Sequence, residues 1–583
     1  MRRRKGLLVA VVATAALAVP VGTAGAGTTG TAAGSSGQRT TAAASGTGEF
    51  VVFYADGVAA SDAHAAIAAA GGTVVDEVGS LGIARVTTDD AGFSRAVTAS
   101  GAVRGVVRNH SVGADRAGAV HRFVEERALE DRATYAAQGG QSSSASSRPG
   151  EGPETFSHLQ WDMQMIGATP NQAHATATGD GVTVGIIDTG IDASHPDLAP
   201  NFNAALSWNF TTDIPDIDGP CETEPDQSCA DPSDVDEAGH GTHVAGIVGA
   251  AYNGLGIAGV APDATLVNLR AGQDSGFFFF FETVAAIAYA GANGIDVVNM
   301  SFYTDPWLYN CGSPDDYVEG TATPEELEQQ ALIREGIIEA VALARSQGVT
   351  LVAAAGNQHT DLAAPTRFDD TSPDYPLETE DTRTVTNECL DLPSEAPGVI
   401  QVSSIGPSKI KADYSTWGYG AIDVAAPGGW FRDYFGTQDF MEPENMILST
   451  YPTEVAREEG AVNPGGGLRD PHFYKRDCTA GRPCAYYQYL QGTSMASPHV
   501  AGVAALIIQA HGTADAGGFS LAPDAVYEIL TSTATDTGCP DPALLDYTQE
   551  GRPASWNATC IGTAEYNSNY GHGIINAAAA VAP

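Results

Sequence analysis

Basic residues are scarce in this chain. Its 583 residues include 28 lysines and arginines against 71 aspartates and glutamates, which gives a formal net charge of −43. So acidic a surface repels the phosphate backbone of nucleic acids, and we exclude nucleic-acid partners. Most of the excess charge is explained by solubility. Oxygen-rich acidic side chains also suit calcium.

Long hydrophobic runs are missing as well. The apolar stretch from Leu7 to Val19 is shorter than the roughly 20 residues that a membrane-spanning helix needs, and Phe277 to Phe281 ends at a glutamate. The basic residues Arg2 to Lys5 precede the first stretch, and Ala24 to Ala26 follow it, which is the pattern of a cleaved export signal. The sequence predicts a signal peptide over residues 1–26, a secreted extracellular protein and no membrane span.

Cysteine is absent before residue 221, and no pair has the spacing Cys-x-x-Cys that would favour metal binding. In an exported chain the eight cysteines are expected to form disulfides. Eight cysteines permit 105 connectivities in principle. Proximity along the sequence suggests the pairs Cys221–Cys229, Cys478–Cys484 and Cys539–Cys560, which leaves Cys311–Cys389.

The first quarter of the chain divides into three segments. Residues 27–48 are mostly glycine, threonine, alanine and serine, so we expect disorder. Residues 49–112 alternate strand, helix, strand, strand, helix and strand, which predicts a small α+β unit of the ferredoxin type. Residues 113–155 begin with a charged stretch and end rich in serine, proline and glycine, which is typical of a linker that proteases cut.

Residues 156–583 alternate apolar strands with helices rich in small residues. This alternation predicts one α/β domain with a parallel sheet flanked by helices on both faces, and sites at the carboxyl ends of its strands. No repeat with a period of 20–50 residues is present. The expected strands are 182–187, 295–300, 349–355, 399–403 and 422–425, and the expected helices are 241–251, 283–292, 325–346 and 495–510.

Three motifs place a reactive side chain at a strand end or a helix start. Asp188 ends an apolar strand, His240 opens one helix and Ser494 opens another. An imidazole can take the proton of a hydroxyl nucleophile and later give it to a leaving amine. A carboxylate fixes the tautomer of that imidazole and stabilises its cation. The three residues therefore form a candidate catalytic triad, in the chain order Asp, His, Ser.

A fourth motif supplies a candidate donor for the oxyanion. Asn357 follows the expected strand 349–355, so its amide and the backbone N–H of Ser494 could meet at one oxygen. Ser494 at the N-terminus of a helix would gain from the helix dipole.

Together these motifs resemble those of the subtilisin family of serine proteases. The resemblance covers residues 156 to about 577 and rests on four phrases: Ile187-Asp188-Thr189-Gly190-Ile191-Asp192, His240-Gly241-Thr242-His243-Val244-Ala245-Gly246, Ala355-Gly356-Asn357 and Gly492-Thr493-Ser494-Met495-Ala496-Ser497-Pro498. It implies a parallel α/β fold and a serine endopeptidase that cleaves internal bonds of proteins or peptides through an acyl-enzyme. Residues 49–112 resemble the inhibitory propeptide of this family, which implies a zymogen that processes itself. We expect a monomer.

The resemblance also assigns the substrate-binding residues Ser301, Phe302, Tyr303, Ala354 and Gly356. Most members of the family have Ser-Leu-Gly where this chain has Ser301-Phe302-Tyr303, so we expect Tyr303 to narrow the pocket for the residue before the cut bond. The run Phe277 to Phe281 is either the wall of a further apolar subsite or a plug against the core or the propeptide. Insertions over 304–323 and 430–489 are expected to be functional lids or rims.

Calcium is the candidate cofactor, in a structural role, and no catalytic cofactor is implied. Asp197 matches the calcium-binding aspartate of the family, and Asn253 lies in the matching loop that supplies one side-chain oxygen. An ordinary Asn-Gly turn is the alternative. His240 and His243 lie three residues apart but lack a third ligand, so zinc is not expected and His243 is interpreted as structural.

Three other functions are alternatives to a serine endopeptidase. Asp188-Thr189-Gly190 and Asp536-Thr537-Gly538 could be the paired loops of an aspartic protease, but that fold is mostly β and this chain is rich in helical stretches. An inactive scaffold is disfavoured because all four catalytic positions are intact. Transfer of the acyl group to an amine in place of water would use the same triad.

Overall fold

The computed structural model describes residues 48–109, 126–137, 153–221, 227–376, 380–479, 482–515 and 518–583. The predicted signal peptide and nearly all of the segment predicted to be disordered lie outside these residues. Among the described residues, no helix is both long and apolar enough to cross a membrane.

Residues 48–109 form the predicted α+β unit. Its antiparallel sheet has the order β2-β3-β1-β4, with β1 at Gly48–Tyr54, β2 at Thr73–Val78, β3 at Ile83–Thr88 and β4 at Val103–Arg108. Helices α1 (Ala60–Ala69) and α2 (Phe93–Thr98) complete the predicted element order. Alternate residues of β1 point to opposite faces, so Phe50 and Val52 pack beneath the helices, while Val51 and Phe53 join a different core.

The largest sheet is parallel and has seven strands in the order β14-β13-β10-β8-β5-β7-β6. Five strands were predicted, and two were missed. Strand β7 carries the polar Asn268 and Arg270, which interrupt the apolar run that signals a buried strand, and β6 has only two residues. The strands are β5 (Thr183–Ile187), β6 (Trp208–Asn209), β7 (Thr265–Arg270), β8 (Val297–Met300), β10 (Thr350–Ala354), β13 (Ile400–Ile405) and β14 (Val424–Pro427).

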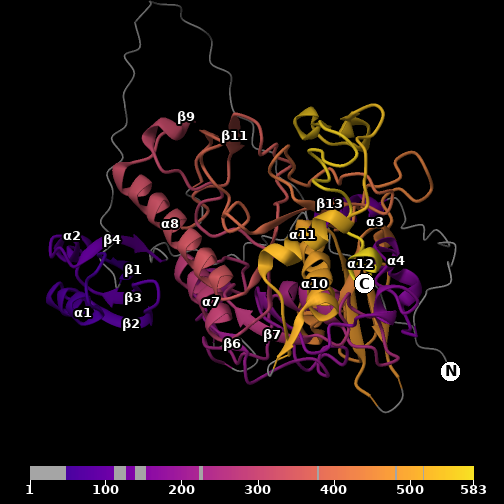
Figure 1. Cartoon of the computed structure of the whole chain (residues 1–583), viewed down its shortest axis with the longest axis horizontal. Helices are drawn as coiled ribbons and strands as arrows, with labels where there is room; N and C mark the ends of the chain where they lie inside the picture. Colours follow the sequence, from indigo (N-terminus) through magenta and orange to yellow (C-terminus); the bar gives the residue numbers. More distant parts are fainter. Residues whose placement is uncertain are drawn as a thin grey trace, which may run out of the picture. The chain divides into compact units, whose positions relative to one another are not determined.

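Helices cover both faces of this sheet, as predicted. Helices α6 (His240–Gly249) and α10 (Thr493–His511) share one core with Val184 and Ile186 of β5. Helices α7 (Phe280–Ala292) and α8 (Pro324–Ser346) lie side by side and share the other core with Ile187 (Figure 1). The helix α11 (Pro523–Thr533) packs on α10.

Both predicted insertions contain secondary structure. The first, over 304–323, contributes β9 (Tyr317–Glu319) to a sheet with β11 (Thr366–Asp369) and β12 (Arg383–Thr386). The second, over 430–489, contains helix α9 (Thr453–Glu458) and strands β15 (Ile447–Tyr451) and β16 (Tyr474–Asp477), and strand β17 (Ala485–Leu490) lies between these two. The disulfides pair as predicted: Cys221–Cys229, Cys311–Cys389, Cys478–Cys484 and Cys539–Cys560.

A helix that was not predicted lies within the expected linker. We call residues 126–137 the strap; it includes helix α3 (Leu129–Ala137). Asp131 of the strap forms an ion pair with Arg432, and the ring of Tyr135 lies 6.2 Å from that of Phe431. Asp131 and Tyr135 are four residues apart, so they share the helix face that packs against the second insertion.

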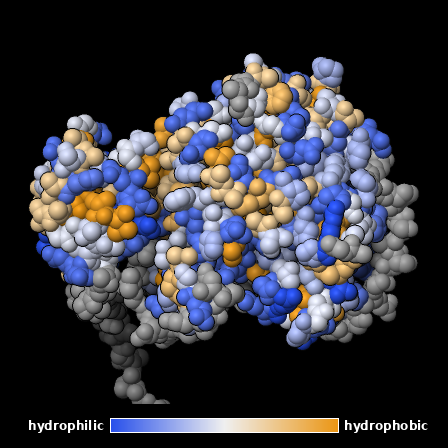
Figure 2. Space-filling view, turned by 90° about the horizontal axis from the view of Figure 1, so that it is seen from below, coloured by the Kyte–Doolittle hydropathy of each residue, from blue (hydrophilic) through white to orange (hydrophobic). Residues whose placement is uncertain are grey.

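The remaining elements are short, and they include α4 (Trp161–Ile166), α5 (Pro215–Asp218), α12 (Ala577–Ala580), β18 (Thr513–Asp515), β19 (Gly518–Ser520), β20 (Leu544–Leu545) and β21 (Ala558–Thr559). On the face of the molecule shown in Figure 2, hydrophilic residues cover most of the surface and hydrophobic ones form separate patches. This distribution agrees with the acidic composition of the chain.

Candidate active site

The carboxyl end of β5 and the start of α6 bring Asp188 and His240 together. The Asp188 Oδ1 atom lies 2.7 Å from His240 Nδ1 and accepts a second hydrogen bond, of 2.8 Å, from the Thr189 backbone N–H. Both side chains are buried. The pair therefore has the geometry in which a carboxylate holds one imidazole nitrogen and leaves the other for proton transfer.

Asp236 links these two elements, and sequence reasoning missed it. Its carboxylate accepts hydrogen bonds from the backbone N–H groups of Gly239 and Thr242, each at 2.9 Å, and from the hydroxyl of Thr189 at 3.0 Å. It thus caps helix α6 and ties the helix to the loop after Asp188. An acidic residue shortly before a helix is the signal that could have found it.

Ser494 lies in the first turn of α10, where its backbone is held by Ser301. The Ser301 hydroxyl donates to the Ser494 carbonyl at 3.0 Å and receives a 2.8 Å hydrogen bond from the Asn299 amide. The chain around the serine is therefore fixed by the end of strand β8.

Glu126 of the strap occupies the space between the candidate catalytic groups. Its Oε1 atom accepts a 2.5 Å hydrogen bond from the Ser494 hydroxyl and a 3.0 Å hydrogen bond from the Asn357 amide. Its Oε2 atom lies 3.1 Å from His240 Nε2. The Asn357 amide is oriented because its oxygen accepts from the backbone N–H of Thr493 at 2.9 Å.

The charge of His240 depends on these neighbours. Burial by itself would lower the pKa of His240, but the carboxylates of Asp188 and Glu126 raise it to about 10. The imidazole is therefore cationic at neutral pH while Glu126 is in place, and a cationic imidazole cannot accept the proton of Ser494.

A cavity of about 270 Å³ opens beside Ser494 and Asn357. The Tyr303 hydroxyl donates to Asp374 at 2.7 Å, and the Phe302 ring stacks on Phe278 with centroids 4.0 Å apart. All five residues predicted to bind substrate line the cavity, namely Ser301, Phe302, Tyr303, Ala354 and Gly356.

The run of five phenylalanines is buried, with 1% of each residue exposed. Phe277 and Phe279 pack with Tyr375, while Phe280 stacks on Phe53 of the α+β unit with centroids 5.6 Å apart. Of the five, Phe278 lines the cavity. Most of the run is therefore a plug against the core and the α+β unit.

The two residues predicted to bind calcium lie in contact. The Asn253 amide donates to Asp197 Oδ1 at 3.1 Å, and the Tyr487 hydroxyl donates to Asp197 Oδ2 at 2.7 Å. Burial raises the pKa of Asp197 to about 7, and the nearby carboxylate of Glu154 adds to this rise. A cation here would replace the Asn253 N–H and supply positive charge to two buried acids.

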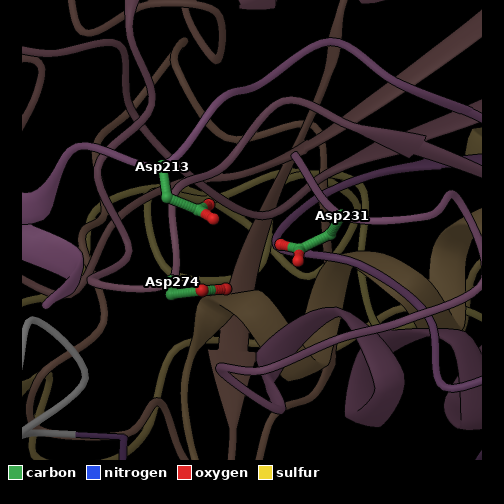
Figure 3. Close-up of side chains that lie close together, drawn as sticks. All are labelled: Asp213, Asp231 and Asp274. Carbon is green, nitrogen blue, oxygen red and sulfur yellow. The ribbon is translucent and has the colours of Figure 1, made fainter. Parts of the chain in front are cut away.

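A second acidic cluster was not predicted. Asp213, Asp231 and Asp274 direct their carboxylates toward one another (Figure 3), with ligand atoms within 4.8 Å. The guanidinium of the buried Arg270 contacts all three, at 3.3, 2.5 and 2.9 Å in that order. Because Arg270 already provides a cation, we assign no metal to this cluster.

The fold and the site together define a peptidase of the subtilisin type. The profile of the subtilase family matches residues 179–573. The chain therefore belongs to the subtilase family of serine peptidases, which confirms the resemblance and overturns the aspartic-protease alternative.

Known relatives agree with this assignment. Subtilisin DY of Bacillus licheniformis is 29% identical over 384 residues, which are 65% of this chain and 93% of that protein. Thermitase of Thermoactinomyces vulgaris is 29% identical over 353 residues, which are 60% of this chain and 83% of that protein. The crystal structure of the epidermin leader peptide processing serine protease from Staphylococcus aureus matches with a TM-score of 0.57 at 22% identity. That match covers 92% of this chain and 98% of the other, and it supports the predicted α/β fold with a parallel sheet flanked by helices.

Proposed function

We propose that this subtilase is a secreted serine endopeptidase that hydrolyses internal peptide bonds and is made as a zymogen. In this proposal residues 1–26 are a signal peptide, 49–112 a propeptide, 113–155 the segment cut during maturation and 156–583 the peptidase domain. Four disulfides favour export to an oxidising compartment.

The proposed reaction uses three side chains in sequence. The Ser494 hydroxyl attacks the substrate carbonyl while His240 Nε2 takes its proton, and Asp188 stabilises the resulting imidazolium. His240 then gives the proton to the leaving amine, which releases the first product and leaves an acyl-enzyme. A water molecule, deprotonated by His240, hydrolyses the ester and restores Ser494.

One observation carries this proposal. A single oxygen, Glu126 Oε1, accepts hydrogen bonds from both Ser494 Oγ and Asn357 Nδ2. Nucleophile and amide donor therefore face the same point, which is what an oxyanion formed by attack of Ser494 requires. We infer that Glu126 mimics this oxyanion.

Contacts of the α+β unit with α7 and α8 support its role as a propeptide. The Asn109 amide donates to both oxygens of the buried Glu282, each at 3.1 Å, and Arg104 forms ion pairs with Glu335 and Glu339. These polar and charged contacts and the stacked Phe53 support a unit that stays bound after cleavage.

The contacts of the strap support the proposal that the uncut chain is inactive more directly than those of the α+β unit do. Arg127 forms an ion pair with Glu459 and donates to the Tyr451 hydroxyl at 3.1 Å, while the Glu126 carbonyl accepts from the Gln491 backbone N–H at 3.0 Å. The second insertion would thus serve as the surface on which the strap docks. With Glu126 in place, Ser494 is hydrogen-bonded away from its base and His240 is protonated, so the uncut chain is proposed to be inactive.

Calcium is proposed as a stabilising ion at the loop around Asn253. The oxygen-rich set formed by Asp197, Glu154 and Asn253 fits calcium, because two of the three are carboxylates whose pKa burial raises. The ion would hold this loop against the segment at Glu154, and it takes no part in catalysis.

A fluorophosphonate probe tests the proposed chemistry. The processed chain is expected to be labelled at Ser494 and to cleave a peptide library at internal bonds, with the products identified by mass spectrometry. The Ser494→Ala variant is the control. Equal labelling of wild type and variant, or an absence of labelling in the processed wild type, would contradict the proposal.

A further inference from the structure

The cavity beside Ser494 contains an acid that the proposed mechanism does not use. Among the described residues that line it, the charged ones are Glu126 of the strap and Asp391 of the peptidase domain. Once the strap leaves, Asp391 is the charged group that remains among the described residues of this wall. Its position next to the catalytic groups makes it a candidate for substrate selection.

The Asp391 carboxylate is buried, and one of its two oxygens has no hydrogen bond within the described residues. The residue is 4% exposed, and its Oδ1 atom receives no hydrogen bond from any described residue. Its backbone is fully engaged, since its N–H donates to Glu395 at 2.8 Å and its carbonyl accepts from the Ser394 hydroxyl at 3.3 Å. A buried carboxylate oxygen without a hydrogen bond is costly, so its retention at a pocket wall points to a ligand that pairs with it.

Arg367, whose charge acts on Asp391, already forms an ion pair with another acid. The Arg367 guanidinium forms a bidentate pair with Glu395, with distances of 2.5 and 2.7 Å, and Arg383 pairs with Asp369. Burial raises the pKa of Asp391 well above its ordinary value, Glu395 and Asp369 raise it further, and Arg367 lowers it. The positive charge of Arg367 near Asp391 is therefore already paired with Glu395.

The backbone that carries Asp391 is tied down on both sides. Leu390 exchanges hydrogen bonds of 2.8 and 3.1 Å with Asn310, and the Leu392 carbonyl accepts from the Thr304 backbone N–H at 2.8 Å. The disulfide Cys311–Cys389 joins the same segments. The first insertion thus holds the carboxylate in a fixed position, which favours recognition of a specific charge.

The shape of the cavity suits a single long side chain. Its volume of about 270 Å³ lies just below the range of roughly 300–1,000 Å³ that is typical of small-molecule sites. Phe302 and Tyr303 provide apolar surface along which the aliphatic stem of a lysine or arginine can pack while its charged end reaches an acid. Because Ser494 and Asn357 share the cavity, the side chain that enters belongs to the residue whose carbonyl is attacked.

We propose that Asp391 makes this cavity a pocket for arginine or lysine at the residue directly before the cut bond. This inference rests on the proposed peptidase function. The segment expected to be cut, 113–155, contains the arginines Arg116, Arg122, Arg127, Arg132 and Arg148 and no lysine, so processing sites of the required kind are present in the chain.

The test compares fluorogenic peptides that differ only in the residue before the cut bond. The processed wild type is expected to cleave after arginine or lysine about 100-fold faster, in kcat/KM, than after phenylalanine or leucine, as expected for a charged hydrogen bond made in a desolvated pocket. Asp391→Asn is expected to lose this advantage, so that its kcat/KM after arginine or lysine falls to within about threefold of its own kcat/KM after phenylalanine or leucine. Asp524→Asn, which removes an exposed charge paired with Arg345 on helix α11, is the matched control and should retain the wild-type preference.

Fluorophosphonate labelling separates the two possible failures. If the wild type is labelled but prefers phenylalanine or leucine, the pocket assignment is wrong and the peptidase proposal stands. If it is neither labelled nor active on any peptide, the peptidase proposal itself fails. The wild-type profile decides the matter even if Asp391→Asn does not fold, and an Asp391→Asn enzyme that keeps the preference for basic residues would also overturn the assignment.

Discussion

Replacement of Glu126 by glutamine should open the active site of the uncut chain. Glutamine keeps the length and one acceptor oxygen but loses the charge that contacts Ser494 at 2.5 Å, Asn357 at 3.0 Å and His240 at 3.1 Å. A hydrogen bond to a charged group contributes roughly 1 kcal/mol more than a neutral one, so three such losses weaken docking by about 3 kcal/mol, or roughly 150-fold.

The assay is the rate at which a fluorophosphonate labels the uncut chain, resolved from the processed chain on a gel. Glu126→Gln is expected to be labelled about 100-fold faster than the wild type at neutral pH. Glu454→Gln changes an exposed acid on helix α9 of the same insertion and should behave as wild type. Equal rates for wild type and Glu126→Gln would show that the strap does not hold the site closed.

The uncut wild type and Glu126→Gln should also differ in how their labelling rates depend on pH. Because the pKa of His240 is raised to about 10, the ion pair with Glu126 stabilises the docked strap fully below the ordinary histidine value of about 6.5 and is lost as pH rises through about 10. Labelling of the uncut wild type should therefore accelerate toward pH 10. In Glu126→Gln one of the two carboxylates is gone, so the rise should occur at lower pH. Superimposable profiles would refute the electrostatic argument.

Three further predictions concern the oxyanion donor, the calcium loop and a disulfide. Asn357→Ala should lower kcat on a peptide substrate by about 10²–10³ with little change in KM, and a loss below tenfold would contradict its role. The pKa of Asp197 is raised to about 7, so ionisation of this buried acid lowers the stability of the folded state as pH rises from about 4 to 7. Above that range the ionised carboxylate can bind calcium. Calcium should therefore raise Tm more at pH 8 than at pH 5, and Asp197→Asn should abolish the difference, whereas equal shifts would argue against the site. In a Ser494→Ala background, Cys311→Ser with Cys389→Ser should reduce the free energy of unfolding in denaturant by about 4.5 kcal/mol for a loop of 78 residues, and unchanged stability would contradict this prediction.

The positions of Asp188, His240, Ser494 and Asn357 could be predicted because each follows from a local pattern. Asp188 comes directly after strand β5, His240 is the first residue of α6 and Ser494 the second residue of α10. Strands of a parallel sheet gather their carboxyl ends at one edge, so local assignments of strand ends also predict which side chains meet.

Glu126 and Asp391 could not be predicted in the same way. Glu126 is separated from Ser494 by 368 residues, and no motif surrounds it. The position and the charged neighbours of Asp391 depend on the disulfide Cys311–Cys389 and on ion pairs such as Arg367–Glu395, which form only in the folded chain. Strand β7 was missed for a related reason, because two of the acids that neutralise its buried Arg270, Asp213 and Asp231, lie far from it in the sequence.

Glu126 and Asp391 together suggest why the strap is not cut while it lies in the active site. Glu126 and Asp391 line the same cavity, and like charges at one site repel, so the strap presents to the pocket a side chain that the pocket should reject. The strap's two arginines contact other groups: Arg127 pairs with Glu459, and the Arg132 guanidinium lies over the ring of Phe473. This arrangement explains how an uncut segment can lie against Ser494 without being a good substrate.

Glu126→Arg should convert the strap from an inhibitor into a substrate. An arginine at this position would be drawn toward Asp391, and we expect its carbonyl to leave the Gln491 backbone N–H and move between Ser494 and Asn357, where attack occurs. We expect mass spectrometry to detect cleavage after position 126 in Glu126→Arg, whereas Glu126→Gln should not be cleaved there. The double variant Glu126→Arg with Asp391→Asn should lose most of this cleavage. If Glu126→Arg is labelled by a fluorophosphonate yet remains intact at position 126, a basic side chain does not select the cut bond and the paired roles of Glu126 and Asp391 are refuted.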